Sequence, residues 1–183
     1  MNLLTVEIQT PRLLLLPISL EYKDDFFSEF TEEVTTYMYS RSAQIMVETE
    51  AFIQKSIQKL ENGINLQLVI LAKDSKEFLG GTGLYNLDKE PELGIWLKKA
   101  AHGHKYGLEA IAALKEWADE NLDYEYLLYL VDQRNIASRK IPEALGGKII
   151  QEYEEINMSG NVLQTLEYRI YKNENRKRKD ASR

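Results

Sequence analysis

Both histidines of the protein fall in one short segment, His102-Gly103-His104-Lys105-Tyr106-Gly107, together with a lysine and two glycines. A strand-like apolar run, ELGIWLKK, precedes the segment, and a helical pattern begins inside it. A loop of this kind leaves backbone N–H groups free at a helix N-terminus, where the helix dipole adds partial positive charge. The glycines let an anion approach the backbone, and the basic side chains surround it. The predicted chemistry is therefore the binding of a diphosphate.

A purely structural role for these residues stays open. An ordinary strand-to-helix connection with solvated side chains would use them equally well. A metal site formed by His102 and His104 lacks a third ligand at a suitable spacing. The chain contains no GxxxxGK[ST] sequence, which excludes an ATP-type phosphate loop. The run GGTG at 80–83 is expected inside a hairpin strand, where glycines favour close backbone packing over a second phosphate site.

The composition is typical of a soluble globular protein, with 44% hydrophobic and 28% charged residues among 183. This length suits one domain with a sizeable core. The net charge of −6 argues against general nucleic-acid binding. Residues 173–183 hold five basic and two acidic side chains, so the body before them carries about −9 and should attract cationic substrates. The basic tail is expected to be disordered, with contact to RNA or another acidic partner as the alternative.

The chain has no cysteine, which excludes disulfides, thiolate metal sites and an acyl-cysteine mechanism. The start, MNLLTVEIQTPRLLLLPIS, has neither a cationic beginning nor a long apolar stretch, so we expect no signal peptide and no membrane anchor. These features favour a cytoplasmic protein that does not contact a membrane.

Hydrophobic periodicity predicts the elements that must position the loop. Strands are expected at 12–18, in the hairpin INLQLVILAKD and EFLGGTGLYNLD, in PELGIWLKK, in YEYLLYLVD, and in the final hairpin KIIQEYEEINM and VLQTLEYRIY. Helices are expected at about 19–31, 47–61, 103–121 and 135–145, and on the third of these Glu109 should point away from the sheet. The order β-αα-βββ-α-β-α-ββ indicates one α/β (α+β) domain with a mixed, mostly antiparallel sheet flanked by helices.

Three segments together resemble the GNAT superfamily of acetyl-CoA-dependent N-acetyltransferases, and within it the Rim-type ribosomal-protein-alanine N-acetyltransferases. They are TPRLLLLPIS, ELGIWL leading into HGHKYGLEA, and NIASRKIPEALGG. The resemblance covers about residues 5–172. It implies a GNAT-like domain over 1–172 with splayed central strands, followed by the tail at 173–183. It also implies acetyl-CoA as cosubstrate and no metal.

The resemblance implies which residues would bind the cosubstrate. His102 to Gly107 match the family loop Q/R-x-x-G-x-G/A, so the N–H groups of Gly103 to Gly107 would hold the pyrophosphate. His102 stands where Gln or Arg is usual, and Lys105 replaces the central glycine. If φ is positive at this position, a lysine costs on the order of 1 kcal/mol. If φ is negative, Lys105 keeps its N–H and adds a cation beside the pyrophosphate.

The late segment matches N-x-x-S-x-x-x-x-E-x-L-G-F. By resemblance, Asn135 would bond the pantetheine arm and Ser138 would face the thioester sulfur. The alternatives are that Asn135 only caps its helix and that Ser138 is an exposed polar position. Pro142 is expected to kink the helix or break its hydrogen bonds, and Gly147 stands where Phe is usual.

The expected chemistry is direct transfer. No acyl-carrying cysteine or Ser-His pair is evident, so a primary amine would attack the acetyl thioester in a ternary complex. Ile95, Trp96 and Leu97, on the splayed strand by resemblance, would bind the cosubstrate and offer N–H groups to the thioester oxygen. A carboxylate acting through water would remove the amine proton; Glu92 is the candidate, with a solvated strand end as its alternative. Ser138 would donate a hydrogen bond to the leaving thiolate.

The expected acceptor is a cationic amine: a protein N-terminus, which the family branch favours, a polyamine or an amino-sugar. The sequence leaves open whether the protein forms a homodimer. Two other functions stay open as well. One is a non-catalytic acetyl-CoA-binding or nucleotide-binding sensor on the same fold, motivated by Lys105, Pro142 and Gly147. The other is a structural adaptor whose basic tail binds RNA.

Overall fold

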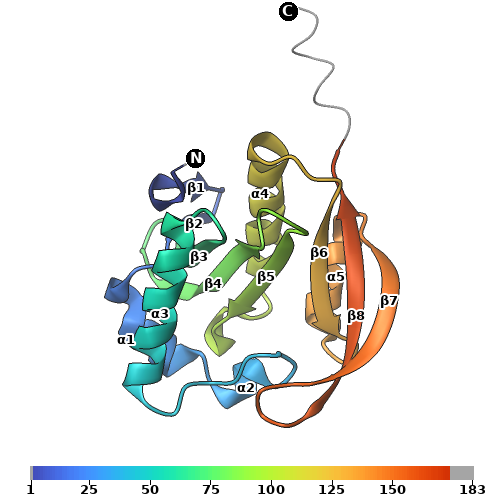
Figure 1. The fold of residues 1–183 in the computed structure, drawn as a ribbon. Coiled ribbons are helices and arrows are strands. Elements are labelled where there is room, and N and C mark those ends of the chain that lie inside the picture. Colours follow the sequence, from blue (N-terminus) through green and yellow to red (C-terminus); the bar gives the residue numbers. More distant parts are fainter. Residues whose placement is uncertain (1, 174–183) are drawn as a thin grey trace, which may run out of the picture.

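The apolar runs of the sequence become the strands of one eight-stranded sheet in this computed structural model, which describes residues 2–173 (Figure 1). The strand order is β1-β2-β3-β4-β5-β6-β8-β7. All neighbours pair antiparallel except β5 and β6, which are parallel. The strands are β1 (Ile8–Gln9), β2 (Leu13–Pro17), β3 (Leu66–Ala72), β4 (Phe78–Tyr85), β5 (Glu92–Leu97), β6 (Tyr126–Asp132), β7 (Lys148–Ile156) and β8 (Val162–Tyr171). The predicted single α/β domain with a mixed, mostly antiparallel sheet is confirmed.

Five α-helices of the described part flank this sheet. They are α1 (Lys23–Glu29), α2 (Glu32–Thr35), α3 (Met46–Glu61), α4 (Tyr106–Asn121) and α5 (Ile136–Ala144). Helices α1 and α3 lie on one face, and α4 and α5 on the other (Figure 1). The sequence predicted four of them. It missed the single turn of α2, which Thr31 caps by accepting a hydrogen bond from the Val34 N–H at 3.3 Å.

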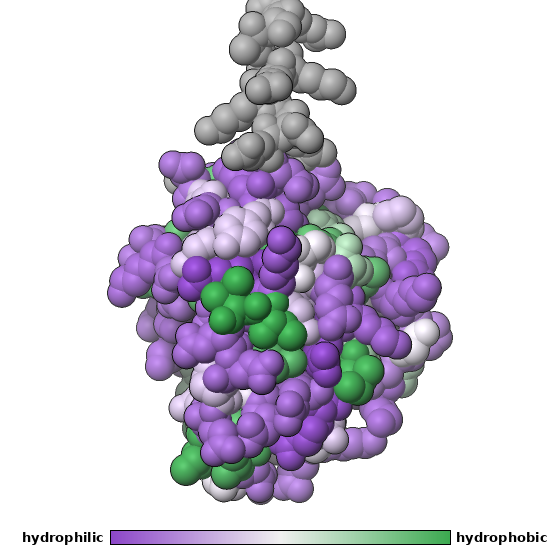
Figure 2. Space-filling view, turned by 90° about the vertical axis from the view of Figure 1, so that its right-hand side faces the viewer, coloured by the Kyte–Doolittle hydropathy of each residue, from purple (hydrophilic) through white to green (hydrophobic). Residues whose placement is uncertain are grey.

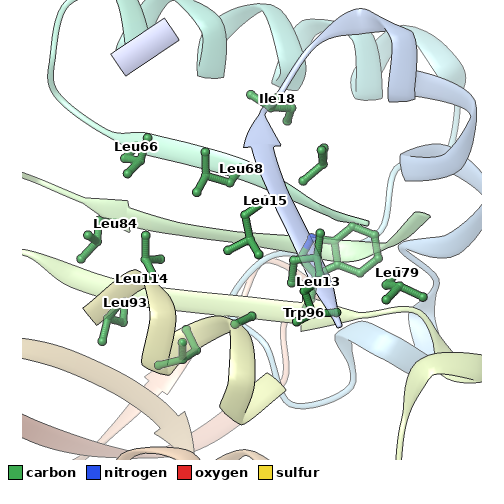
Figure 3. Packing of buried hydrophobic residues seen from close by; sticks show 14 of the residues in the cluster. Leu13, Leu15, Ile18, Leu66, Leu68, Leu79, Leu84, Leu93, Trp96 and Leu114 are labelled. Atoms are coloured by element: carbon green, nitrogen blue, oxygen red, sulfur yellow. The ribbon is translucent and has the colours of Figure 1, made fainter. Parts of the chain in front are cut away.

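Leucines from four strands and from α4 form the main core (Figure 3). Leu15, Leu68, Leu84, Leu93 and Leu114 are fully buried, and each buried leucine contributes about 1.5–3 kcal/mol to folding. This packing holds α4 against the middle of the sheet. The loop that precedes α4 therefore stands on a rigid base.

An aromatic cluster covers the opposite face at the end of β5. The Trp96 indole packs edge-on against Phe26 of α1, with ring centroids 5.3 Å apart. A Cβ added to Gly81 would lie 2.7 Å from the indole nitrogen of Trp96, and one added to Gly80 would lie 2.2 Å from the Trp96 carbonyl oxygen. The run GGTG is therefore a site of close packing, as predicted, and no phosphate loop.

Strands β5 and β6 pair only over two positions and then separate. The paired residues are Glu92 with Leu128 and Leu93 with Tyr129, although β5 continues to Leu97. The predicted splaying of the central strands is confirmed. We call the unpaired stretch beyond these residues the β5–β6 gap.

Strand β7 forms one outer edge of the sheet, and in the described residues its only strand neighbour is β8. Ile149, Ile150 and Ile156 on this strand are 42%, 48% and 67% exposed, and Glu152 and Glu154 are exposed beside them. Figure 2, which faces this edge, shows apolar side chains as small groups among polar ones.

The predicted basic tail lies outside the described residues, apart from Asn173. Over residues 2–173, no helix combines the length and apolar character needed to cross a membrane.

Candidate active site

The loop between β5 and α4 presents a row of backbone N–H groups without a partner. Within residues 2–173, the N–H groups of residues 103–108 make no hydrogen bond, and the first to bond backwards is that of Glu109, which donates to the Lys105 carbonyl at 3.2 Å. Six consecutive free N–H groups at the positive end of a 16-residue helix are an arrangement that favours an anion. We call residues 103–108 the amide row.

The carbonyl groups of this loop, by contrast, are occupied by side chains. The His102 Nε2 lies 2.9 Å from the Leu97 carbonyl oxygen, and the His104 Nδ1 lies 2.8 Å from that of His102. Arg12 donates from Nη1 to the His104 carbonyl at 3.0 Å. Both imidazoles and Arg12 thus bind the carbonyl oxygens of Leu97, His102 and His104, whereas the N–H groups that follow have no partner in the described residues.

Glu109 anchors the first turn of α4 to the segment before β2. Its carboxylate accepts hydrogen bonds from the Thr10 hydroxyl at 2.6 Å and from the Arg12 Nε at 2.7 Å. Burial alone would raise the pKa of Glu109, but these hydrogen bonds outweigh it and hold the pKa below its usual range. The prediction that Glu109 points away was wrong, because helical periodicity does not reveal a partner almost a hundred positions earlier in the chain.

Lys105 adopts the left-handed conformation, with φ of 62° and ψ of 17°. Positive φ is the condition under which a lysine at this position is strained, by about 1 kcal/mol. The Lys105 N–H nevertheless belongs to the amide row, and its exposed side chain adds a cation next to it. A lysine in place of the central glycine of the loop therefore lowers the stability of the fold but keeps the backbone N–H donor.

Replacing Lys105 by Gly should raise the free energy of unfolding by up to about 1 kcal/mol, because glycine adopts positive φ without strain and only part of the gain is lost to the freer unfolded chain. Urea denaturation measures the difference. Lys76, with φ of 61° in another turn, provides the matched variant Lys76→Gly, for which the same direction is expected. If Lys105→Gly were less stable than wild type, the conclusion that Lys105 is strained would be wrong.

The backbone of β5 offers hydrogen-bonding groups to the β5–β6 gap at alternate residues. The Leu128 N–H donates to the Pro91 carbonyl at 2.8 Å, so the polar groups of residue 91 face β6. Since these groups alternate along a strand, those of Ile95 and Leu97 face the same side, where β6 no longer pairs. The sequence predicted both as cosubstrate contacts.

Trp96, predicted together with them, has its backbone groups on the β4 side. Its neighbour Gly94 accepts a hydrogen bond from the Thr82 hydroxyl of β4 at 2.9 Å, which fixes this alternation. The Trp96 indole belongs to the aromatic cluster on the α1 face. Ile95 and Leu97, but not Trp96, therefore direct their backbone groups to the gap.

Gly107 brings the loop, β5 and α5 together. A Cβ added here would lie 3.1 Å from the Ile141 Cδ1 of α5 and 3.8 Å from the side chains of Ile95 and Leu97. The first turn of α4 thus packs directly against the part of β5 that borders the gap. The amide row lies where the gap opens.

Ser138 of α5 contacts β6 at the start of the gap, and Asn135 precedes this helix. The Asn135 Oδ1 accepts a hydrogen bond from the Ser138 N–H at 3.2 Å, so Asn135 caps the helix. The Ser138 Oγ lies 2.7 Å from the Tyr129 hydroxyl. Tyr129 is the last residue of β6 that pairs with β5 and is 3% exposed, and this burial raises its pKa to about 12. The sequence did not identify Tyr129 as a site residue. Its spacing of two from Leu127 and Val131 shows only that its side chain points inward with theirs.

Pro142 does not break α5, which continues to Ala144. Because Pro142 stands near the end of the helix, its missing N–H affects only one late hydrogen bond. The Pro142 carbonyl accepts from the Gly147 N–H at 2.8 Å, and a Cβ on Gly147 would lie 2.8 Å from the same oxygen. This close turn explains why glycine replaces the larger residue expected at 147.

Asp132 fixes the connection from β6 to α5. Its fully buried carboxylate accepts from the backbone N–H and the Nε of Arg134, both at 2.8 Å, and from the Gln164 N–H at 3.0 Å. Burial acts to raise the pKa of Asp132, yet these donors keep it below its usual range. The charge therefore stabilises the start of α5, and with it the position of Ser138.

Replacing Asp132 by Asn should lower the free energy of unfolding by about 2–4 kcal/mol at pH 7, because buried donors lose a charged acceptor. The pKa is lower in the folded state, so this contribution is present above about pH 4 and is lost as the pH falls through the folded pKa. Denaturation should show that the difference in unfolding free energy between wild type and Asp132→Asn is smaller in acid than at pH 7. Asp123→Asn, at an exposed position, is the control; equal losses in both variants would refute the role.

Glu92 lies on the α1–α3 face, because residues four apart on a strand point to the same side and Trp96 packs against α1. Burial raises the pKa of Glu92 to about 7, with smaller contributions from the charges of Glu155 and Glu167. In the described part of the chain, no ion pair offsets its charge. A carboxyl group with this pKa can accept a proton near neutral pH. It stands at the closed end of the β5–β6 gap, on the face opposite to Ser138.

A polar cleft of about 490 Å³ lies on the periphery, between α2 and the β7–β8 turn. Glu33, one of its lining residues, pairs with Lys99 just after β5 at 2.6 Å. The Asn157 side chain donates to the Met38 carbonyl at 3.1 Å, which ties the β7–β8 turn to the segment after α2. The cleft is lined by Glu32, Glu33, Thr35, Thr36, Arg41, Ser42, Gln44, Asn157, Ser159 and Asn161.

Residues 12–148, most of the chain, match the sequence model of the family described as acetyltransferase (GNAT) domain. The chain belongs to the GNAT acetyltransferase family. As a GNAT protein it is an acyltransferase, and GNAT acetyltransferases use acetyl-CoA. Among curated proteins, none is similar enough in sequence to count as a match.

Solved structures share the GNAT fold. Spermidine N-acetyltransferase from Vibrio cholerae, in complex with CoA and spermine, has a TM-score of 0.77 at 13% identity over 89% of this chain and 97% of that one. A candidate ribosomal-protein-serine acetyltransferase from the same organism gives 0.76 at 17% identity, over 92% and 98%. A GCN5-related N-acetyltransferase from Brucella melitensis gives 0.76 at 16% identity, over 91% and 79%.

Proposed function

We propose that this GNAT acetyltransferase moves an acetyl group from acetyl-CoA to a primary amine by direct attack in a ternary complex. The observation that carries the proposal is the amide row, six free N–H groups at the mouth of the β5–β6 gap. A pyrophosphate bound there would let a pantetheine arm follow β5 into the gap. The reacting group would then arrive between Ser138 on one face and Glu92 on the other.

The proposed contacts to acetyl-CoA come from three elements. The amide row, including Gly103, His104, Tyr106 and Gly107, would bind the pyrophosphate, with Lys105 adding a cation and His102 holding the loop. The N–H groups of Ile95 and Leu97 would bind the arm and the thioester oxygen. Fixed backbone donors of this kind contribute about 3 kcal/mol each in other acyl-transfer sites. Ser138 would donate to the sulfur, and Asn135 holds the helix that carries it.

Glu92 would accept the amine proton, directly or through one water. Its pKa of about 7 keeps a large fraction ionised at neutral pH and makes it a stronger base than an ordinary glutamate. An α-amino group, with a pKa near 8, is easier to deprotonate than a lysine side chain near 10.4. This difference supports a protein N-terminus as one acceptor class.

The charge around Glu92 supports a cationic acceptor. Glu155 and Glu167 both contribute to its raised pKa, so several carboxylates share one region. A polyamine, an amino-sugar or a protein N-terminus of the Rim type would each bring positive charge. A structural relative was solved with spermine, which makes polyamines a necessary part of any test. The cytoplasmic location and a homodimer stay predictions.

Release of free CoA thiol from acetyl-CoA tests the function. The acceptor panel should hold peptides beginning with alanine or serine, spermidine, spermine and an aminoglycoside, with acetylated products identified by mass. We expect thiol release with at least one of them. Calorimetric binding of CoA without turnover on any acceptor would overturn the enzyme and favour a sensor. Absence of binding would remove the cosubstrate site as well.

A further inference from the structure

A buried tyrosine stands behind the serine proposed to face the sulfur. The Tyr129 hydroxyl lies 2.7 Å from the Ser138 Oγ, and in the described residues it has no other hydrogen-bond partner. Tyr129 comes from β6 and Ser138 from α5. Their contact occurs at the last paired position before β5 and β6 separate.

The surroundings of the pair indicate which hydroxyl donates. A hydroxyl carries one proton, and a buried hydroxyl without a partner for it is costly. The Tyr129 proton has only the Ser138 Oγ to reach, because its ring is 3% exposed. Ser138 is only partly buried, so its own hydrogen can point outward. The favoured arrangement has Tyr129 donating to Ser138, whose hydrogen is then directed away from Tyr129.

We infer that Tyr129 is a positioning residue that acts through Ser138: it fixes the serine hydroxyl hydrogen toward the sulfur of the bound coenzyme. This inference rests on the proposed function, which puts that sulfur beside Ser138. A thiolate at this place would accept a hydrogen bond from a serine that is itself polarised by a second donor.

The pair does not need to give up a proton. The CoA thiol is more acidic than either hydroxyl: a thiol has a pKa near 8.5, whereas burial raises that of Tyr129 to about 12. Proton transfer from Tyr129 through Ser138 to the thiolate would therefore be unfavourable. The expected effect is a stabilised thiolate, with solvent supplying the proton later.

The test compares wild type, Tyr129→Phe, Ser138→Ala and the double variant. The first measurement is the pKa of the CoA thiol in each complex, from the ultraviolet absorbance of the thiolate. Tyr129→Phe should raise this pKa by about 0.5–1 unit, a three- to tenfold loss of thiolate stabilisation. In the Ser138→Ala background the same change should have no further effect. The measurement needs bound CoA only, so it separates this inference from a failure of turnover.

Turnover gives the second measurement. Tyr129→Phe should lower kcat about five- to tenfold, with the KM for acetyl-CoA unchanged within twofold. Tyr168→Phe is the matched control, since the hydroxyl of this buried tyrosine also contacts α5, through Glu143 at 2.8 Å and Arg139 at 3.5 Å, and makes no hydrogen bond to Ser138. An unchanged thiol pKa in Tyr129→Phe, or an equal shift in the presence and absence of the Ser138 hydroxyl, would overturn the inference.

Discussion

Replacement of Glu92 by Gln is expected to lower kcat about 10²- to 10³-fold at pH 8, the loss typical when a positioned base is removed. Gln keeps the shape of the side chain but accepts no proton. Binding of acetyl-CoA should stay within about twofold, because Glu92 lies at the closed end of the β5–β6 gap and far along β5 from the amide row. Steady-state kinetics at saturating acetyl-CoA, together with calorimetry, check both parts.

The pH profile of kcat gives the sharper signature. Only the carboxylate form accepts a proton, so wild-type kcat should rise about tenfold per pH unit below pH 7 and level off above it, following the Glu92 pKa of about 7. The Glu92→Gln variant should lose this step. A variant that keeps both the rate and the step would exclude Glu92 as the base.

Stability should move in the opposite direction to activity in the same variant. The pKa of Glu92 is raised from 4.5 to about 7 on folding, so its ionisation destabilises the folded state. This cost is absent below about pH 4.5, grows as the pH rises, and is complete above pH 7. Gln removes it, so Glu92→Gln should be more stable than wild type at pH 8 by up to about 3 kcal/mol and equal at pH 4. Denaturation at the two pH values measures this.

Glu167→Gln is the matched variant. It removes one of the negative charges that raise the pKa of Glu92 and leaves Glu92 in place. The midpoint of the kcat profile should shift to lower pH while the plateau stays within about threefold of wild type. A collapse of the plateau would mean that Glu167 itself takes part in the reaction.

Replacement of Gly103 by Asp is expected to raise the Kd for CoA about 100-fold or more. Gly103 has φ of 82°, and a Cβ added there meets no atom within 4 Å, so the side chain fits. A carboxylate about 5 Å from one charge of the pyrophosphate costs about 3 kcal/mol at an effective dielectric constant near 20. Isothermal calorimetry at low salt measures the Kd.

Gly103→Asn separates charge from backbone strain, because Asn has the same shape and tolerates positive φ about as well as Asp. It should weaken CoA binding less than about tenfold. High salt should recover part of the loss in the Asp variant only. Equal Kd values for both variants would show that no anion sits at the amide row.

The sequence could predict the elements and the loop with free backbone N–H groups, because both depend on local patterns. Gly103 and Gly107 stand at the strand-to-helix junction where the structure has the free amides, and Ser138 stands on the helix that borders the gap. The φ of Lys105 could be stated only as a condition, since a lysine in that position is rare. Four residues of α2 were too few to show a period.

The remaining features depend on residues that only the fold brings together. The pKa of Glu92 depends on its burial and on charges from β7 and β8. Glu109 meets Arg12, and Tyr129 meets Ser138, through packing between a strand or its flank and a helix. Periodicity shows that such side chains point inward, but not which partner they find there.

The outer strand β7 has a consequence for behaviour in solution. Its outward backbone groups could continue a sheet into another molecule, and its exposed isoleucines would add apolar contact. In the described residues, the exposed charged side chains of this strand are Lys148, Glu152 and Glu154, so its charge is mainly negative and repels a second copy of the same edge. Colloidal stability at this edge is thus electrostatic, and acid or concentrated salt, which neutralises or screens carboxylates, removes it.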